Sequence, residues 1–252
     1  MGAYEKKSGG TRLCVVNHAG SENSIEVFDF RDGKLSYLKT ITDPLLVSPN
    51  DLVMLDENRF YVTNDHGAAS YNGKMIEDYL RISRANVLVY DGQNFSLAAD
   101  RLSYANGINM SPDGSIVYVA ETVAKKISVY SRHDDDTLTF KQEIFLGTGV
   151  DNIELDNDGG LWIGSHPKLL TFIYHAENPD AVSPSQVLRL SMDENRSYIF
   201  QEIYLSIGED LSGSSVAAVY DNTLLIGAVL DDHFLMCSLA RSVMDTINQA
   251  GR

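Results

Sequence analysis

The sequence predicts an all-β protein of the β-propeller class, and two observations support this prediction. Most of its apolar segments alternate with a period of two, as in SIEVFDF (24–30) and KISVY (126–130). In addition, four segments of similar pattern recur along the chain, and each contains two short strands joined by a turn. Periods of about 40–60 residues with several strands per unit are typical of β-propellers. A single β-sandwich is the weaker alternative, because it does not require this repetition.

The four repeated segments share one register. In each, a polar residue opens a short strand, an Asn or Gly follows eight residues later, and an apolar strand comes next. The segments are NDLVMLDENRFYVTND, NGINMSPDGSIVYVAE, DNIELDNDGGLWIGSH and SSVAAVYDNTLLIGAV, which begin at Asn50, Asn106, Asp151 and Ser214. Each is therefore expected to form the first two strands of one blade.

The two ends of the chain depart from the repeat. RLCVVNH (12–18) matches only the second strand of a segment, so we expect residues 1–11 to lack a first strand and to lie outside the propeller. A partial blade over 12–41, three fuller units and a last unit ending near Leu239 amount to about four to five blades. Residues 12–239 are thus predicted to form a single propeller domain. The segment LARSVMDTINQ (239–249) predicts a short C-terminal helix within a tail that covers 240–252.

Composition narrows the class of function. The chain has 252 residues, 44% of them hydrophobic, and a formal net charge of −15. Such an acidic chain is not suited to nucleic acid or to anionic membrane surfaces, whereas it is compatible with calcium. No apolar run is long enough to span a membrane, and the N-terminus has no apolar signal segment, so cytoplasmic residence is expected if the chain is expressed as written. Cys14 and Cys237 are expected to be buried free thiols, although one disulfide between them is possible.

The shared register brings out a candidate metal site. Equivalent positions in propeller blades lie on a ring around the central channel, and the first position of the repeat holds Asn50, Asn106 and Asp151, with Asn152 beside the last. Their carboxamide and carboxylate oxygens are ligands that Ca²⁺ prefers. The sixteenth position holds Asp65, Glu121 and His166, which we expect to form a second polar ring at the far end of the second strand. Capping of strand ends explains this second set equally well.

Several motifs resemble those of the serum paraoxonase/arylesterase family. They are VVNH, PNDLV followed by FYVTNDH, YANGINMSPDGSIVYVAE, VDNIELD with GSHP, AENP, and LLIGAV with CSL, and they span about Arg12 to Leu239. The resemblance implies a six-bladed propeller with two calcium ions in its central tunnel, which hydrolyses lactones and aryl esters. Compared with the six-bladed propeller of that family, the propeller of this chain is expected to be incomplete. Family members are often secreted or associated with membranes.

The resemblance also implies roles for individual residues. Asn50, Asn106, Asp151 and Asn152 match ligands of the catalytic calcium, and Asp51 matches a ligand of the structural calcium. His18 matches the second member of a proposed histidine dyad, while His166 and Phe172 match positions that line the active-site cavity. An acidic ligand for each calcium, the other histidine of the dyad and the cysteine that pairs with the one matching Cys237 would all lie upstream of this chain's start.

The expected function is calcium-dependent hydrolysis of aryl esters or lactones. Calcium would polarise the carbonyl group. His18 would assist the attack of water, since the ordinary imidazole pKa of about 6.5 suits a general base at neutral pH. No Gly-x-Ser-x-Gly motif or zinc-ligand spacing is present. The other four histidines, His66, His133, His175 and His233, are expected to have no role in the site. One alternative is a truncated, non-catalytic calcium-binding propeller or scaffold; another is a gluconolactonase-type propeller.

Overall fold

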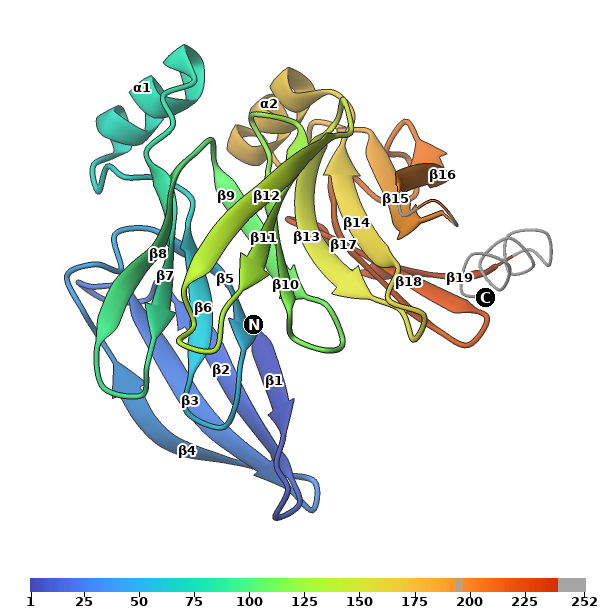
Figure 1. Ribbon diagram of the computed structural model, residues 1–252. Helices are drawn as coiled ribbons and strands as arrows, with labels where there is room; N and C mark the ends of the chain where they lie inside the picture. The colour runs from blue at the N-terminus through green and yellow to red at the C-terminus, as the bar shows by residue number, and fades with distance from the viewer. Residues whose placement is uncertain (194, 196, 240–252) are drawn as a thin grey trace. The chain divides into compact units, whose positions relative to one another are not determined.

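A computed structural model describes residues 1–193, 195 and 197–239 of the chain (Figure 1). The chain divides into two compact units, and each is described here by itself. The first unit comprises Met1–Ala124 and Ser128–Gln142, and the second comprises Lys125–Ile127 and the chain from Glu143 onward. The helix predicted from 239–249 falls almost entirely on residues 240–252, which lie outside the described residues.

Three four-stranded sheets account for most of the first unit. In each sheet, every strand is hydrogen-bonded to the strand before it in sequence, which is the up-and-down order of a propeller blade. The first sheet contains β1 (Gly2–Glu5), β2 (Thr11–Asn17), β3 (Ser24–Arg31) and β4 (Lys34–Ile41). The second contains β5 (Pro49–Met54), β6 (Phe60–Asn64), β7 (Ala85–Tyr90) and β8 (Phe95–Leu102). The third contains β9 (Ala105–Met110), β10 (Ile116–Glu121), β11 (Lys126–Arg132) and β12 (Leu138–Phe145).

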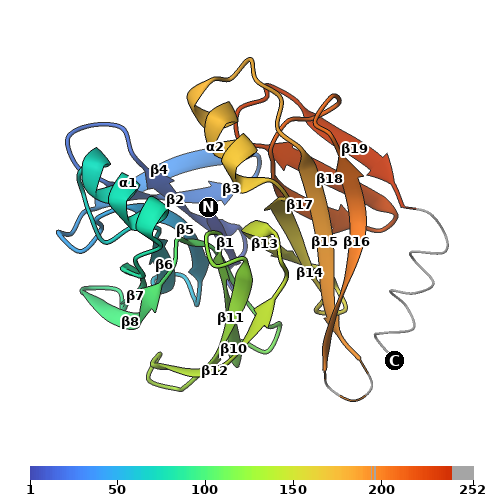
Figure 2. The same cartoon turned by 90° about the horizontal axis from the view of Figure 1, so that it is seen from above.

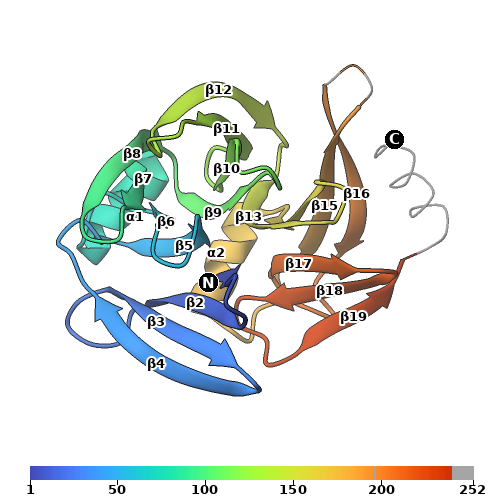
Figure 3. The ribbon, with the colours of Figure 1, turned by 60° about the horizontal axis from the view of Figure 1, so that its bottom comes forward.

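The second unit contains two further sheets with the same strand order. One contains β13 (Gly149–Leu155), β14 (Leu161–His166), β15 (Ser185–Met192) and β16 (Tyr198–Ser206), and Figure 2 shows β15 and β16 as a long hairpin. The other contains β17 (Ser214–Tyr220), β18 (Thr223–Ala228) and β19 (Phe234–Ser238), which Figure 3 shows side by side. The described residues therefore form five sheets of the blade type, and the predicted all-β propeller class is confirmed.

The N-terminal residues differ from the prediction. We expected no first strand within residues 1–11, but Gly2–Glu5 forms β1 and pairs antiparallel with β2, with Gly2 opposite Cys14 and Glu5 opposite Thr11. The prediction was wrong because a strand of four residues that contains glycine is too short to show a period of two. The first sheet is therefore four-stranded rather than partial.

Two short helices were also not predicted. Helix α1 (Tyr71–Leu80) connects β6 to β7, and α2 (Leu169–Glu177) connects β14 to β15 (Figure 1). Ser70 caps the start of α1, since its side chain accepts a hydrogen bond from the backbone N–H of Gly73, and Arg81 ends the helix in the left-handed conformation. Neither described helix is long and apolar enough to cross a membrane.

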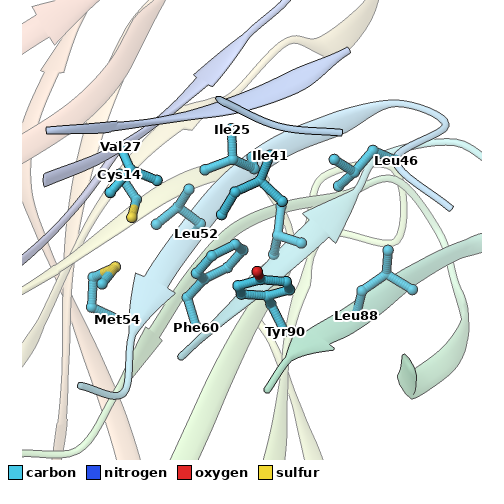
Figure 4. Packing of buried hydrophobic residues seen from close by; sticks show 11 residues of the cluster. Cys14, Ile25, Val27, Ile41, Leu46, Leu52, Met54, Phe60, Leu88 and Tyr90 are labelled. Atoms are coloured by element: carbon cyan, nitrogen blue, oxygen red, sulfur yellow. The ribbon is translucent and has the colours of Figure 1, made fainter. Parts of the chain in front are cut away.

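A hydrophobic cluster joins the first two sheets of the first unit (Figure 4). Cys14 and Val27 of the first sheet pack with residues of the second, where the rings of Phe60 and Tyr90 stack with centroids 5.0 Å apart. Cys14 is buried and free, and burial raises the pKa of its thiol to about 11. Cys237, in the second unit, is also free but only half-buried. The prediction of free thiols is thus confirmed for both cysteines and the prediction of burial for Cys14 alone, and the alternative disulfide is not formed.

Candidate metal site

A β-bulge marks the position at which each repeated segment begins. In β5 and β9 of the first unit, and in β13 and β17 of the second, the pairing with the following strand shifts by one residue. The pairs of residues in the first three bulges are Asn50–Asp51, Asn106–Gly107 and Asp151–Asn152, opposite Thr63, Ala120 and Gly164 respectively. Bulges re-aim side chains and recur next to active sites. The predicted ligands therefore lie within the strands, at equivalent bulges.

In the first unit, two carboxamides are held through their nitrogen atoms. Asn50 Nδ2 donates to Oδ2 of Asp65 at 3.1 Å, and Asn106 Nδ2 donates to Oγ1 of Thr122 at 3.1 Å. Among the described residues, neither Oδ1 atom accepts a hydrogen bond from the protein. These oxygens are therefore available to a ligand, and Asn106 is only 6% exposed.

Asp51 follows Asn50 in the same bulge but has different partners. Its Oδ2 accepts a hydrogen bond from the backbone N–H of Ile108 in β9 at 3.1 Å, and its Oδ1 pairs with the amino group of Met1 at 3.1 Å. Adjacent residues of one bulge thus turn Asn50 toward Asp65 and Asp51 toward β9. That the two residues belong to different metal sites stays a prediction.

In the second unit, the bulge of β13 carries the remaining predicted ligands. Asp151 is 5% exposed, and its Oδ2 lies 3.0 Å from Nε2 of His166 at the end of β14. Asn152 Nδ2 donates to Oγ of Ser215 at 2.9 Å and to Oδ1 of Asp151 at 3.2 Å. As with the other two carboxamides, the nitrogen is used within the protein and no described residue donates to the oxygen.

His166 and Phe172, the predicted cavity residues, lie together. Their rings stack with centroids 3.5 Å apart and planes inclined by 11°, so α2 holds Phe172 flat against His166. His166 is 1% exposed, and its Nδ1 has no hydrogen-bond partner among the described residues. An unpartnered nitrogen in so buried a ring is uncommon and often marks a functional position.

The polar residues expected at the far end of the second strand lie beside the first position of the repeat. Because the strands of a hairpin are antiparallel, the sixteenth residue of the repeat returns beside the first: Asp65 contacts Asn50 and His166 contacts Asp151. Asp65 and His166 therefore lie at the far end of the second strand, as expected, and this end adjoins the predicted ligands. Glu121 behaves differently, since it accepts hydrogen bonds from the backbone N–H of Ser103 and the hydroxyl of Ser128.

His18, the predicted base, lies in the first unit just beyond β2 and is exposed. Its Nδ1 is 3.0 Å from Oδ1 of Asn23, whose Nδ2 donates to the carbonyl groups of Leu46 and Val47. Because these two carbonyls fix the orientation of the Asn23 amide, its oxygen faces His18 and Nδ1 must be the protonated nitrogen. The lone pair of neutral His18 is thereby placed on Nε2. Among the described residues, His18 makes no hydrogen bond to a predicted ligand.

His66 has a larger role than expected. It is 5% exposed and lies between two carboxylates, with Nδ1 2.6 Å from Oδ1 of Asp65 and Nε2 3.1 Å from Oδ1 of Asp78 in α1. Burial lowers the pKa of His66, but the two carboxylates outweigh it and raise the pKa to about 9. Burial raises the pKa of Asp65, but hydrogen bonds from His66 and two other side chains hold it below its usual value. His66 therefore helps fix Asp65, the partner of Asn50.

The donor atoms fit a hard cation better than a soft one. The predicted ligands offer carboxylate and carboxamide oxygens, which Ca²⁺ prefers, and the three carboxamide oxygens accept no hydrogen bond within the described structure. No group of three or more His, Cys, Asp or Glu side chains in the described part of the chain is arranged to hold a metal.

Five blade-type sheets define a β-propeller, and equivalent bulges in each unit carry oxygen donors of the kind that a hard cation prefers. Solved propellers share the fold. A periplasmic gluconolactonase from Pseudomonas aeruginosa matches with a TM-score of 0.57 at 13% identity, over 94% of this chain and 65% of its own. Regucalcin from Agrobacterium tumefaciens, described as a calcium-binding protein, matches with a TM-score of 0.50 at 15% identity, over 99% and 72% of the two chains.

Sequence comparison identifies the family. The Arylesterase family model matches residues 1–239, so the chain belongs to the arylesterase family. Serum paraoxonase/arylesterase 1 of Mus musculus is 41% identical over 221 residues, which are 86% of this chain and 61% of the relative. Serum paraoxonase/arylesterase 2 of Rattus norvegicus is 38% identical over 231 residues, 90% and 64% of the respective chains. The chain thus spans about three fifths of the length of these relatives. The match includes residues 1–11.

Proposed function

We propose that this protein is a calcium-dependent hydrolase of aryl esters, lactones or both. The observation that carries the proposal is the set of three carboxamides whose nitrogens are bound within the protein and whose oxygens are not. Family membership supports the reaction class, since the relatives are named paraoxonases and arylesterases. The calcium-binding description of regucalcin is consistent with a cation in a fold of this kind.

In this proposal, Asn50, Asn106, Asp151 and Asn152 hold the catalytic calcium through their side-chain oxygens. Asp51 belongs to a second, structural calcium. When bound, the catalytic ion would polarise the substrate carbonyl and stabilise the negative charge that develops on its oxygen. The protein's part is to keep these oxygens in place, which the hydrogen bonds from Asn50 to Asp65 and from Asn152 to Ser215 are suited to do. A six-bladed propeller stays a prediction of the family resemblance.

His18 is the proposed general base. Its Nδ1–H is directed at Asn23, so neutral His18 presents the lone pair of Nε2 and can take a proton from water at that atom. The ring is exposed, so water reaches it without a conformational change. His166 and Phe172 are proposed to line the substrate site: the half-buried ring of Phe172 would face an acyl or aryl group, and the buried ring of His166 would hold it in place by stacking.

A panel of three substrates tests the reaction class. We expect the purified chain to hydrolyse phenyl acetate or a simple δ-lactone faster than it hydrolyses gluconolactone, whose many hydroxyl groups match an aromatic wall poorly. The rates of hydrolysis by His18→Gln and by the wild type would show whether the proposed base contributes. The variant is expected to be about 100-fold slower. Absence of turnover on all three substrates would contradict the proposed reaction. Preference for gluconolactone would point to a sugar lactonase instead.

A further inference from the structure

The side chain of Thr63 in β6 connects the bulges that carry the predicted ligands of the first unit. Thr63 is the residue opposite the Asn50–Asp51 bulge, and it is completely buried. Its Oγ1 donates to the backbone carbonyl of Asn106 at 2.7 Å and accepts from the backbone N–H of Asp51 at 3.0 Å. One hydroxyl therefore bonds to the backbone of a predicted ligand in each of two neighbouring sheets.

A second bond runs in parallel with this contact. The carboxylate of Asp51 accepts a hydrogen bond from the backbone N–H of Ile108, two residues beyond Asn106 in β9. The β5 bulge is thus tied to the β9 bulge on both sides, by a hydroxyl from β6 and by its own side chain. Such paired, buried bonds restrict how far the two bulges can move relative to one another.

The corresponding position in the second unit has a different residue, and the two neighbouring sheets are connected there in a different way. Gly164 lies opposite the Asp151–Asn152 bulge, and a Cβ atom there would lie 2.3 Å from the backbone of Ser215 in the neighbouring sheet. The absence of a side chain lets the β17 bulge approach β14 directly, and Asn152 then bonds to Ser215. In both units, the residue opposite the bulge sets the distance from that sheet to the next bulge.

We propose that Thr63 is a positioning residue for calcium, which acts by fixing the spacing between the Asn50–Asp51 bulge and Asn106. Removing its hydroxyl would leave the Asp51 N–H and the Asn106 carbonyl without this partner. The spacing between the ligand oxygens of β5 and those of β9 would then no longer be fixed. This inference rests on the calcium site proposed above, but it assigns a role to a residue whose own side chain does not reach the ion.

The test compares calcium affinity among matched variants. Calcium binding is measured by isothermal titration after removal of bound metal with EGTA. We expect Thr63→Val to weaken binding by about 10–100-fold, as for other residues that orient metal ligands. Thr63→Ser, which retains the hydroxyl, should bind close to wild type. Ser185→Ala is the control: Ser185 is equally buried and its Oγ donates to the carbonyl of Leu211, but it belongs to another sheet and touches no predicted ligand.

A second readout needs no metal. Amide hydrogen exchange at Asp51 should accelerate in calcium-free Thr63→Val and stay slow in Thr63→Ser. Wild-type affinity in Thr63→Val, or an equal loss in Ser185→Ala, would overturn the inference while leaving the calcium site intact. A wild-type chain that binds no calcium would overturn both. If Thr63→Val does not fold, Thr63→Cys takes its place, and its calcium affinity is expected to be lower than that of the wild type.

Discussion

Asp151 is the residue on which the proposed calcium site most depends. It is buried at the β13 bulge, where its carboxylate contacts the side chains of His166 and Asn152, and no Lys or Arg among the described residues pairs with it. A cation is the natural partner for a buried carboxylate.

Asp151→Ala should weaken calcium binding by more than the roughly 100-fold that loss of an orienting residue can cause. The measurement is the rise in melting temperature on adding calcium, which reports binding to the folded state. Asp158→Ala is the control, because Asp158 lies exposed in the following turn. A calcium-induced shift that is the same in Asp151→Ala as in the wild type would refute its role as a ligand.

His66 predicts a dependence of stability on pH. Its pKa in the folded protein, about 9, lies above the ordinary value of about 6.5. The stabilisation is therefore complete below about pH 6.5 and is lost as the pH rises through about 9. Unfolding free energies from urea titrations of wild type and His66→Gln should differ most near pH 6 and converge near pH 10. His133→Gln, on an exposed turn, is the control. A difference that stays constant with pH would contradict this account.

At the scale of elements, the hairpins could be predicted from sequence and the bulges could not. Alternation with a period of two and turn residues at fixed spacing depend only on local sequence, so the first two strands of each repeated segment were found. A bulge depends on which residue pairs across the hairpin, and the repeat alone does not contain that information. For this reason the contacts of Asp65 with Asn50 and of His166 with Asp151 were not predicted.

The helices were missed for a related reason. Helix α1 includes Asn72 and Gly73, which have low helix propensity, and polar contacts rather than an apolar stripe hold it. Glu77 accepts a hydrogen bond from the backbone N–H of Gly67, and Asp78 pairs with His66. Tertiary contacts of this kind leave no periodic pattern in the sequence. The pair of acidic residues near the end of α1, 11 and 12 residues after His66, was the only available signal.

Gly164 tests how closely neighbouring sheets of the second unit must approach. Gly164→Ala should destabilise the protein by about 3 kcal/mol or more, because the new Cβ would overlap the backbone of Ser215. Gly33→Ala provides a comparison: Gly33 has a φ of 74° and no atom near its Cβ position, so only backbone strain of about 1 kcal/mol is expected. Chemical denaturation of the two variants measures both costs. An equal, small loss at both positions would show that the sheets can separate to admit a side chain.

At the scale of the whole molecule, the repeat carried most of what the sequence could predict. It indicated the propeller class and selected Asn50, Asn106 and Asp151 by register, and the motifs identified the family that the comparison confirms. Which side chains orient these residues depended on contacts between strands: Thr63, His66 and Ser215 gave no signal in the repeat. The central claim is that oxygen donors at these bulges bind calcium and that hydrolysis depends on it.

Calcium dependence of the reaction tests this claim most directly. The initial rate of phenyl acetate hydrolysis by the EGTA-treated chain would be measured as a function of free calcium. The account predicts no hydrolysis above background without calcium and a saturable return of activity as calcium is added, which Asp151→Ala should lack. Hydrolysis that persists unchanged in excess EGTA, or that stays absent at saturating calcium, would contradict it.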